Sequence, residues 1–512
     1  MSLLEPGASL EMLNQFWITL LLVIPMVLIA RTVVAGTRYS PILIIVIFGL
    51  MMGYLLVATG VATPGLPEFL LVDLVAKVTI VALVVSFFVG GQELRKIFGN
   101  MELDPDDMVV PSTEEIVLGT NSTQLFFLVR TFFIFLGIEG LNRLLVDGQG
   151  SDPLAQFYPL IAYIGIVGSI ILVDPKATVK NKSLYIRKGV LEMTVILLVL
   201  YLSFYIAMWV RPTIALPQIF FAMILSASCG ALVYRWTFGP TIRALLFAGI
   251  PVVLAANFLV GGSRIAEAFQ LTGMNAVMAY GFFGQLFWMF GGIAILILVG
   301  KSNHVRNLAP GMAGGLSHSG LTGACTAGDL GKKAALRAPI MINIPFFGHI
   351  FVFSILAVSA QRGELLLGWS ALVAAAGLII TFWALRTLAR AGENDSKEVK
   401  GLMQFSFGWQ LTAIFGGMLL LAITQLPINY AAMAQSSALS HFGLFAATQE
   451  GMFGETAASL IPFIFAMPFL VHPLVFGMFG KAMEKEGRMP EAIVYILAVI
   501  GIAGVLYAVF AA

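Results

Sequence analysis

The chain has 512 residues, of which 59% are hydrophobic and only 11% are charged, and its formal net charge is +2. A soluble domain carries about 25% charged residues, so this composition excludes a protein whose surface is solvated mainly by water. The mean hydropathy of +0.94 and the recurring apolar runs, each roughly as long as the bilayer core is thick, predict an all-α polytopic membrane protein.

Apolar segments follow one another along almost the whole chain. We expect about 14 transmembrane helices, at residues 13–34, 41–61, 73–92, 122–145, 154–173, 189–210, 216–236, 244–262, 276–300, 338–358, 364–386, 402–424, 457–480 and 490–510. The first segment lacks the flanks of a removed signal peptide, so it is interpreted as a membrane helix. Two further segments, 308–331 and 431–454, are hydrophobic but rich in Gly, Ala, Ser and Thr.

The distribution of Lys and Arg favours re-entrant hairpins for both Gly-rich segments. Basic residues near helix ends stay on the cytoplasmic side, and the basic loop 176–188 therefore fixes the cytoplasm between the fifth and sixth crossings. With two hairpins, 23 of the 29 basic residues fall inside. If either segment spanned, the basic residues after it, at 332–337 or 481–488, would move outside. We expect 308–331 to open to the cytoplasm and 431–454 to the exterior.

An internal repeat contains these hairpins. Leu316–Phe353 aligns without a gap on Leu439–Phe476, 123 residues later, and the preceding helices match around Gln285 and Gln410. The identical pairs include Ser317/Ser440, His318/His441, Gly320/Gly443, Gly328/Gly451, Gly331/Gly454, Pro339/Pro462, Pro345/Pro468, Phe346/Phe469 and His349/His472. Agreement over such a length indicates a duplicated unit. One intervening crossing gives the two copies opposite orientations, which predicts inverted repeats.

A weaker repeat relates two three-helix units. Crossings one to three end in FFVGG at Phe87–Gly91, and crossings six to eight end in NFLVGG at Asn257–Gly262. The expected organisation is a three-helix unit (1–92), a cytoplasmic loop with two linking helices (93–188), an inverted three-helix unit (189–262), a helix with a cytoplasm-facing hairpin (276–358), a linking helix (364–386), an inverted helix with an exterior-facing hairpin (402–480) and a C-terminal helix (490–512).

The hairpin tips are the candidate binding site. Backbone that leaves a helix within a membrane needs partners in protein or in a water-filled cavity. Carbonyl groups there can coordinate Na⁺, and helix N-termini can hold a carboxylate. The candidate residues for substrate and ion are Gly315, Ser317, His318, Ser319, Gly320, Thr322, Asp329, Ser440, His441, Gly443, Thr448 and Gln449. The alternative interpretation is that small residues only allow close helix packing.

Histidines and acids leave further alternatives open. His318, His349, His441 and His472 form two repeat-related pairs, which could bind a metal or haem or relay protons. A lone membrane His is more often a hydrogen-bonded core residue, and the short spacing of metal ligands is missing, so we expect no resident cofactor. Intramembrane acids are functional candidates, and Asp329 could be an ion ligand or the partner of the lysines that follow it. The other acids of interest are Glu139, Glu192, Glu450 and Glu455.

The hairpin motifs resemble those of a known transporter family. AGGLSHSG at Ala313–Gly320, SHFGLFAAT at Ser440–Thr448 and the SFFVGG helix end are similar to the glutamate:sodium symporter family and its relatives, including the 2-hydroxycarboxylate transporters. This resemblance implies a scaffold and a moving transport domain, Na⁺ coupling, an anionic substrate and a homodimer. It implies that Ser317, His318, Gly320, His441, Gly443 and Thr448 line the site. Unlike in that family, both hairpin units here follow the second three-helix unit.

The function expected from these patterns is ion-coupled secondary transport. We expect alternating access with two hairpin gates, Na⁺ as coupling ion, and a small organic anion such as glutamate or a dicarboxylate, in a bacterial inner membrane with both termini exterior. A cation/proton antiporter using Asp329 or Glu450 is the alternative, and a membrane redox protein with His-ligated haem or metal is the second. A nucleotide-binding loop is missing from the sequence, and neither enzymatic activity nor a nucleic-acid partner is expected.

Overall fold

The computed structural model is mostly helical in the part of the chain that it describes. It describes residues 41–66, 87–96, 218–233, 254–326, 330–392, 395–484 and 487–510, with scattered positions between 18 and 34 and between 84 and 210. Asp329, Glu139 and Glu192 lie outside the described residues, as do almost all of the expected crossings at 122–145 and 154–173. Within the described ranges, β-structure is limited to two isolated bridges.

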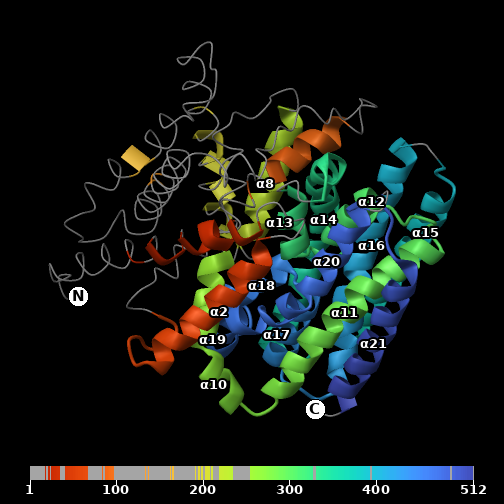
Figure 1. Ribbon diagram of the computed structural model, residues 1–512. Helices are drawn as coiled ribbons and strands as arrows, with labels where there is room; N and C mark the ends of the chain where they lie inside the picture. Colours follow the sequence, from red (N-terminus) through yellow and green to blue (C-terminus); the bar gives the residue numbers. More distant parts are fainter. Residues whose placement is uncertain are drawn as a thin grey trace.

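The helices follow one another with short connections in the second half of the chain (Figure 1). Their bounds are α2 (Ile42–Ala58), α8 (Gln218–Leu232), α10 (Ile265–Gln270), α11 (Met274–Leu298), α12 (Val305–Leu316), α13 (Ser319–Thr326), α14 (Lys332–Arg362), α15 (Leu367–Ala389), α16 (Asp395–Ala422), α17 (Ile428–Leu439), α18 (Phe442–Gln449), α19 (Glu455–Ile464), the 3-10 helix η3 (Met467–Leu470), α20 (His472–Glu484) and α21 (Glu491–Phe510). Further helical stretches cover residues 87–96 and Leu254–Ser263.

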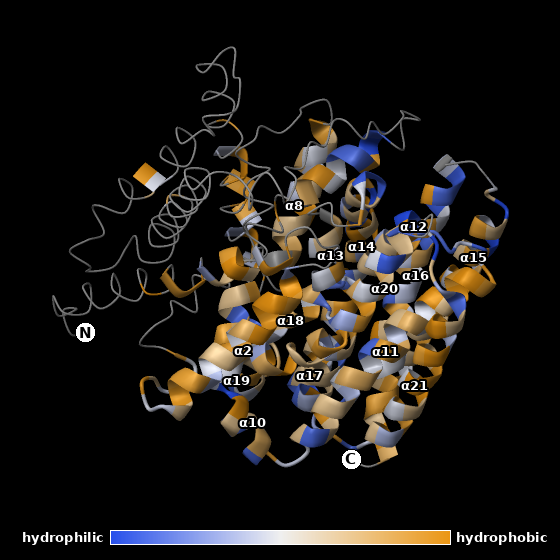
Figure 2. Ribbon diagram, viewed as in Figure 1, coloured by the Kyte–Doolittle hydropathy of each residue, from blue (hydrophilic) through white to orange (hydrophobic). Residues whose placement is uncertain are grey.

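Five of the described helices, α11, α14, α15, α16 and α21, are long and apolar enough to cross a membrane. Each overlaps a crossing expected from the sequence. Large apolar side chains such as Trp369, Phe382 and Ile496 are exposed on α15 and α21, where the ribbon is strongly hydrophobic (Figure 2). A mostly helical fold with several helices apolar enough to span a membrane is therefore confirmed, whereas the total of 14 crossings stays a prediction.

The crossing expected at 457–480 is not one straight helix. α19 ends at Ile464, the chain continues through η3, and the helices on either side differ in direction by 43°. Its counterpart α14 begins six residues before the expected start at 338 and runs unbroken for 31 residues, although it carries prolines at the equivalent positions. A proline removes one backbone donor and strains a helix, but here prolines alone do not determine the break. The two copies of the repeat therefore differ in this segment.

Glycines let helices from distant parts of the chain touch backbone to backbone. A Cβ on Gly53 of α2 would overlap the carbonyl oxygen of Leu259, and a Cβ on Gly230 of α8 would overlap that of Phe88. Close approach of this kind is typical of membrane helices, whose association depends on packing. α2, from the first three-helix unit, thus packs on a helix of the second unit, and α8, from the second, packs on a helix of the first.

The helical stretches at 87–96 and Leu254–Ser263 contact the two hairpin units in matching ways. A Cβ on Gly90 would lie 2.5 Å from the carbonyl oxygen of Pro339, and one on Gly261 would lie 2.6 Å from that of Pro462. The neighbouring rings also match, with centroids 4.8 Å apart for Phe87–Phe346 and 4.7 Å apart for Phe258–Phe469, both edge to face. The two repeats detected in the sequence are therefore in contact with each other.

Alanine in place of Gly230 should destabilise the protein, because its Cβ would overlap a backbone carbonyl of another helix. Overpacking of this kind costs about 1–3 kcal/mol, which thermal unfolding in detergent micelles would detect. Gly368→Ala is the matched control, since nothing lies within 4 Å of a Cβ added at that position of α15 and Ala is the better helix former. Equal melting temperatures for the two variants would contradict the close contact.

Candidate functional site

Two helices break at equivalent serines in the interior of the protein. α12 is followed by Ser317, with φ 50° and ψ 43°, and α17 is followed by Ser440, with φ 49° and ψ 40°. This left-handed conformation costs a residue other than Gly about 1–2 kcal/mol. Both breaks are closed by the same bonds, in which the serine N–H and the following His N–H donate to carbonyls of the last helical turn. This pattern is a Schellman cap.

The two breaks meet tip to tip. Ser319 N–H donates to the Ser440 carbonyl at 2.9 Å, and Phe442 N–H donates to the Ser317 carbonyl at 3.0 Å. These bonds form an isolated antiparallel bridge centred on the histidine of each tip, and the hydroxyls of Ser319 and Ser440 lie 2.9 Å apart. The tip residues are buried. Each tip thereby satisfies backbone groups that the other tip leaves open.

Each tip histidine caps the helix that follows it. Leu321 N–H lies 3.0 Å from His318 Nδ1, and Leu444 N–H lies 2.9 Å from His441 Nδ1. A backbone N–H can only donate, so both Nδ1 atoms accept and the ring protons must be on Nε2. His318 and His441 are therefore neutral in this arrangement, with Nε2–H free to donate to a further group.

A second pair of histidines accepts hydrogen bonds from these Nε2–H groups. His318 Nε2 lies 3.2 Å from His472 Nε2, and His441 Nε2 lies 3.2 Å from His349 Nε2. His349 and His472 must accept at Nε2, which places their own protons on Nδ1. His349 Nδ1 lies 3.2 Å from the Phe346 carbonyl, to which it donates. His472 Nδ1 is buried with no partner among the described residues.

Two buried glutamines complete the cluster. The side-chain amide of Gln285 in α11 lies 2.5 Å from His318 Nε2, and that of Gln410 in α16 lies 3.1 Å from His441 Nε2. Because both Nε2 atoms carry a proton, the amide oxygen is the atom that accepts a hydrogen bond from each of them. Sequence reasoning used both glutamines only as markers of the repeat.

The first turns of α13 and α18 have little bonding capacity left. Besides the bridge and the His caps, Thr322 N–H and Phe445 N–H donate to the carbonyls of their tip histidines at 2.9 and 3.0 Å. Within these two turns, the N–H groups of Gly320 and Gly443 have no hydrogen-bond partner among the described residues. The sequence pattern led us to expect open helix N-termini at both tips. In each turn one of these donors instead bonds to the other tip, and two bond to the histidine of their own tip.

The structure brings together most, but not all, of the residues predicted for the site. Those at the two tips, or in the turns beside them, are Gly315, Ser317, His318, Ser319, Gly320, Ser440, His441 and Gly443. Thr322 lies one turn further along α13 and is buried. Thr448 and Gln449 lie at the far end of α18, where Thr448 bonds back to the Leu444 carbonyl and Gln449 bonds to Asn257. Their side chains are thus engaged away from the tips.

Acidic residues near the hairpins are placed at the surface. Glu450 directly follows α18 and Glu455 begins α19, and both are exposed. Among the residues that the structure describes, no group of three or more His, Cys, Asp or Glu side chains is arranged to hold a metal ion.

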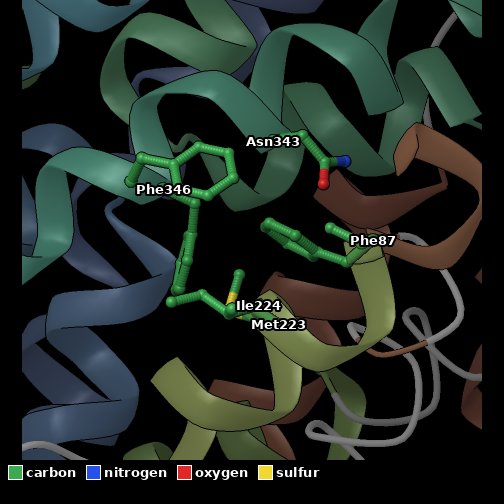
Figure 3. A pocket seen from close by; sticks show the side chains of 7 residues that line it. Phe87, Met223, Ile224, Asn343 and Phe346 are labelled. Atoms are coloured by element: carbon green, nitrogen blue, oxygen red, sulfur yellow. The ribbon is translucent and has the colours of Figure 1, made fainter. Parts of the chain in front are cut away.

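A small pocket lies beside the pair formed by His349 and His441. Phe87, Met223, Asn343 and Phe346 contribute to its lining (Figure 3), and it contains about 160 Å³ of empty space, although no part of it is wide enough for a water molecule. Asn343 donates to the Pro339 carbonyl at 2.7 Å, while its Oδ1 is buried without a partner in the described chain. Phe346 separates the pocket from His349, with ring centroids 4.0 Å apart.

The first turn of α12 is fixed by polar contacts to its neighbours. Buried Arg337 of α14 donates to Asn307 of α12 and to Glu398 of α16, the latter at 3.4 Å. Asn307 also donates to Glu398. Just before the helix, His304 forms an isolated bridge with Arg488. The end of α12 opposite to the tip is therefore held by charges as well as by packing.

Comparison with protein-family models gives no match for this chain. Searches of curated proteins and of solved structures likewise find no similar protein.

Acidification should weaken the anchoring of α12 through His304. Burial first, and then the positive charges of Arg306 and Arg488, hold the pKa of His304 below its usual value, against the raising effect of Glu398. The folded protein binds this proton less readily than the unfolded chain does. The contribution to stability is therefore complete above the ordinary pKa of about 6.5 and is lost as the pH falls from there toward the lowered pKa.

We expect His304→Gln to reduce the loss of thermal stability that accompanies a change from about pH 7.5 to about pH 5. The melting temperature of both proteins, measured across this range in detergent, checks the expectation. A pH profile that is the same in the variant would show that other groups cause the loss.

Proposed function

We propose that the chain is an ion-coupled secondary transporter in which the two broken-helix segments, α12–α13 and α17–α18, are re-entrant hairpins that act as gates. The observation that carries the proposal is the tip-to-tip contact of the two breaks. Non-helical backbone at membrane depth is tolerated where it is buried in protein or lines a cavity. In secondary transporters such breaks hold the substrate and the coupling ion.

The exchange of partners between the repeats supports an inverted-repeat design. His318 pairs with His472, and its counterpart His441 pairs with His349, which is itself the counterpart of His472. Contacts that swap partners in this way are those of two units related by a two-fold axis. The glycine contacts of the three-helix units swap partners in the same manner. Sites located where such repeats meet are the recurring plan of secondary transporters.

Separation of the tips would free the groups that bind ions and anions. The bridge occupies the Ser317 and Ser440 carbonyls, which are suitable ligands for Na⁺, and the Ser319 and Phe442 N–H groups, which are suitable donors to a carboxylate. Opening one gate therefore exchanges protein–protein bonds for bonds to cargo. A ligand can shift this equilibrium only through its differential affinity for the two states, and replacement of the bridge provides such a difference.

The cargo follows from the chemistry of the tips and from the resemblance of their motifs to the glutamate:sodium symporter family. We propose Na⁺ as the coupling ion and a small organic anion such as glutamate or a C4-dicarboxylate as the substrate. Placement in a bacterial inner membrane, with both termini exterior and with a homodimer as the assembly, belongs to the same proposal.

Uptake into proteoliposomes tests the function directly. Radiolabelled glutamate or succinate should accumulate when Na⁺ is higher outside than inside, and accumulation should stop when the gradient is collapsed. A second experiment imposes a proton gradient in place of the Na⁺ gradient. Failure of every gradient to drive uptake, together with proton movement driven by Na⁺, would replace symport by cation/proton antiport.

A cross-link between the tips should block transport. Ser319 and Ser440 are suited to it, because their hydroxyls lie 2.9 Å apart and a disulfide needs Cβ atoms about 3.5–4.5 Å apart. In a background without Cys229 and Cys325, the Ser319→Cys/Ser440→Cys protein should lose most uptake on oxidation and regain it on reduction. Each single-Cys variant is a control and should not respond. Full uptake by the oxidised, cross-linked protein would show that the tips do not separate during transport.

A further inference from the structure

The two tips differ in one hydrogen bond. His349 Nδ1 donates to the carbonyl of Phe346, one turn earlier in the unbroken helix α14. The counterpart of Phe346 is Phe469, which lies in η3, and its carbonyl is turned toward the N–H of Val471 at the end of that short helix. The chain break before α20 thus removes the acceptor that His472 would have in a regular helix. His472 Nδ1–H is left as a fully buried donor without a partner in the described chain.

This donor lies beside the first turn of α13. A Cβ added to Gly320 would lie 2.6 Å from His472 Cε1 and 3.1 Å from its Nδ1, so this edge of the ring packs directly against the glycine. The rings of Phe469 and Phe476, with centroids 4.1 and 5.1 Å from that of His472, hold its orientation in apolar surroundings. The same turn contains the Gly320 N–H group, which has no hydrogen-bond partner among the described residues.

The second tip lacks this pair of donors. A Cβ on Gly443 would lie 3.0 Å from His349 Nε2, and this nitrogen accepts from His441. The other nitrogen, Nδ1, donates its hydrogen bond to the Phe346 carbonyl. The first tip therefore offers an anion two hydrogen-bond donors and the positive end of a helix dipole, whereas the second offers one backbone N–H.

We propose that the anionic group of the cargo binds at the α13 tip alone, held by His472 Nδ1–H and Gly320 N–H, so that the two repeats are unequal in binding although they are similar in sequence. This inference rests on the transport function proposed above. A carboxylate is the acceptor that suits a neutral N–H donor at a helix N-terminus. A water molecule shares the acceptor chemistry, and the experiment separates the two.

Two substitutions at each of the two histidines test the assignment. In place of His, Asn puts an amide N–H near the position of Nδ1, whereas Gln puts its amide near the position of Nε2 and leaves Nδ1 unreplaced. Binding of L-glutamate and of succinate is measured by calorimetry on the full-length protein in nanodiscs. We expect His472→Gln to weaken binding about tenfold or more and His472→Asn to weaken it by less than about threefold. The matched changes His349→Gln and His349→Asn should both stay within about threefold.

Ring nitrogen resonances of the ¹⁵N-histidine-labelled wild-type protein give a second readout that needs no substitution. The Nδ1 signal of His472 should shift on addition of glutamate or succinate, and that of His349 should not. Equal losses from Asn and Gln at position 472, a loss confined to His349→Gln, or an unchanged His472 Nδ1 signal would overturn the inference. In the last case the acceptor is water.

Failure of this inference is distinguishable from failure of the transport function. Gradient-driven uptake with normal binding by His472→Gln removes only the assignment to the α13 tip. A His472 signal that responds to the anions in a protein without any uptake would keep the binding site and remove the transport function.

Discussion

Hydrogen bonding of backbone that has left the helix is the constraint on which the rest of this structure depends. A buried N–H or C=O group that finds no partner is costly, so a helix that stops in the interior of the protein must find partners there. Here the break at Ser317 finds part of its partners in the break at Ser440, and the reverse is equally true. Neither segment can therefore change its conformation without altering the bonding of the other.

The surrounding helices make this contact possible by approaching each other closely. Gly377 of α15 and Gly408 of α16 face each other's helix so tightly that a Cβ on either would lie about 2.7 Å from a threonine of the partner helix. A Cβ on Gly501 or Gly504 of α21 would likewise overlap atoms of α11. Because apolar side chains gain little by leaving lipid for protein, such contacts supply packing energy that hydrophobic burial does not. The tips are thus held within a frame of closely packed helices.

Much of the helical frame could be predicted from the sequence, because the length of an apolar run is set directly by the thickness of the bilayer. α11, α15, α16 and α21 all lie near their expected bounds. The Gly-rich segments and the alignment of His318 on His441 predicted where helices would break and that the two breaks would be alike. The hydrogen-bonding partners were not predictable, since His472 is 154 residues away from His318 and only the folded chain shows which nitrogen faces which. The break before α20 was not predictable either. The prolines near it do not signal a break, because α14 carries prolines at the equivalent positions and continues as one helix.

The exchange of partners between the two hairpin units also bears on how such a chain could arise. Each unit supplies half of a histidine pair to the other unit, and neither pair forms within a single unit. A shorter ancestral chain with one such unit would have completed every one of these contacts only by associating with a second copy of itself. Fusion of two such copies would then have allowed one of them to lose a hydrogen bond that the other still needs.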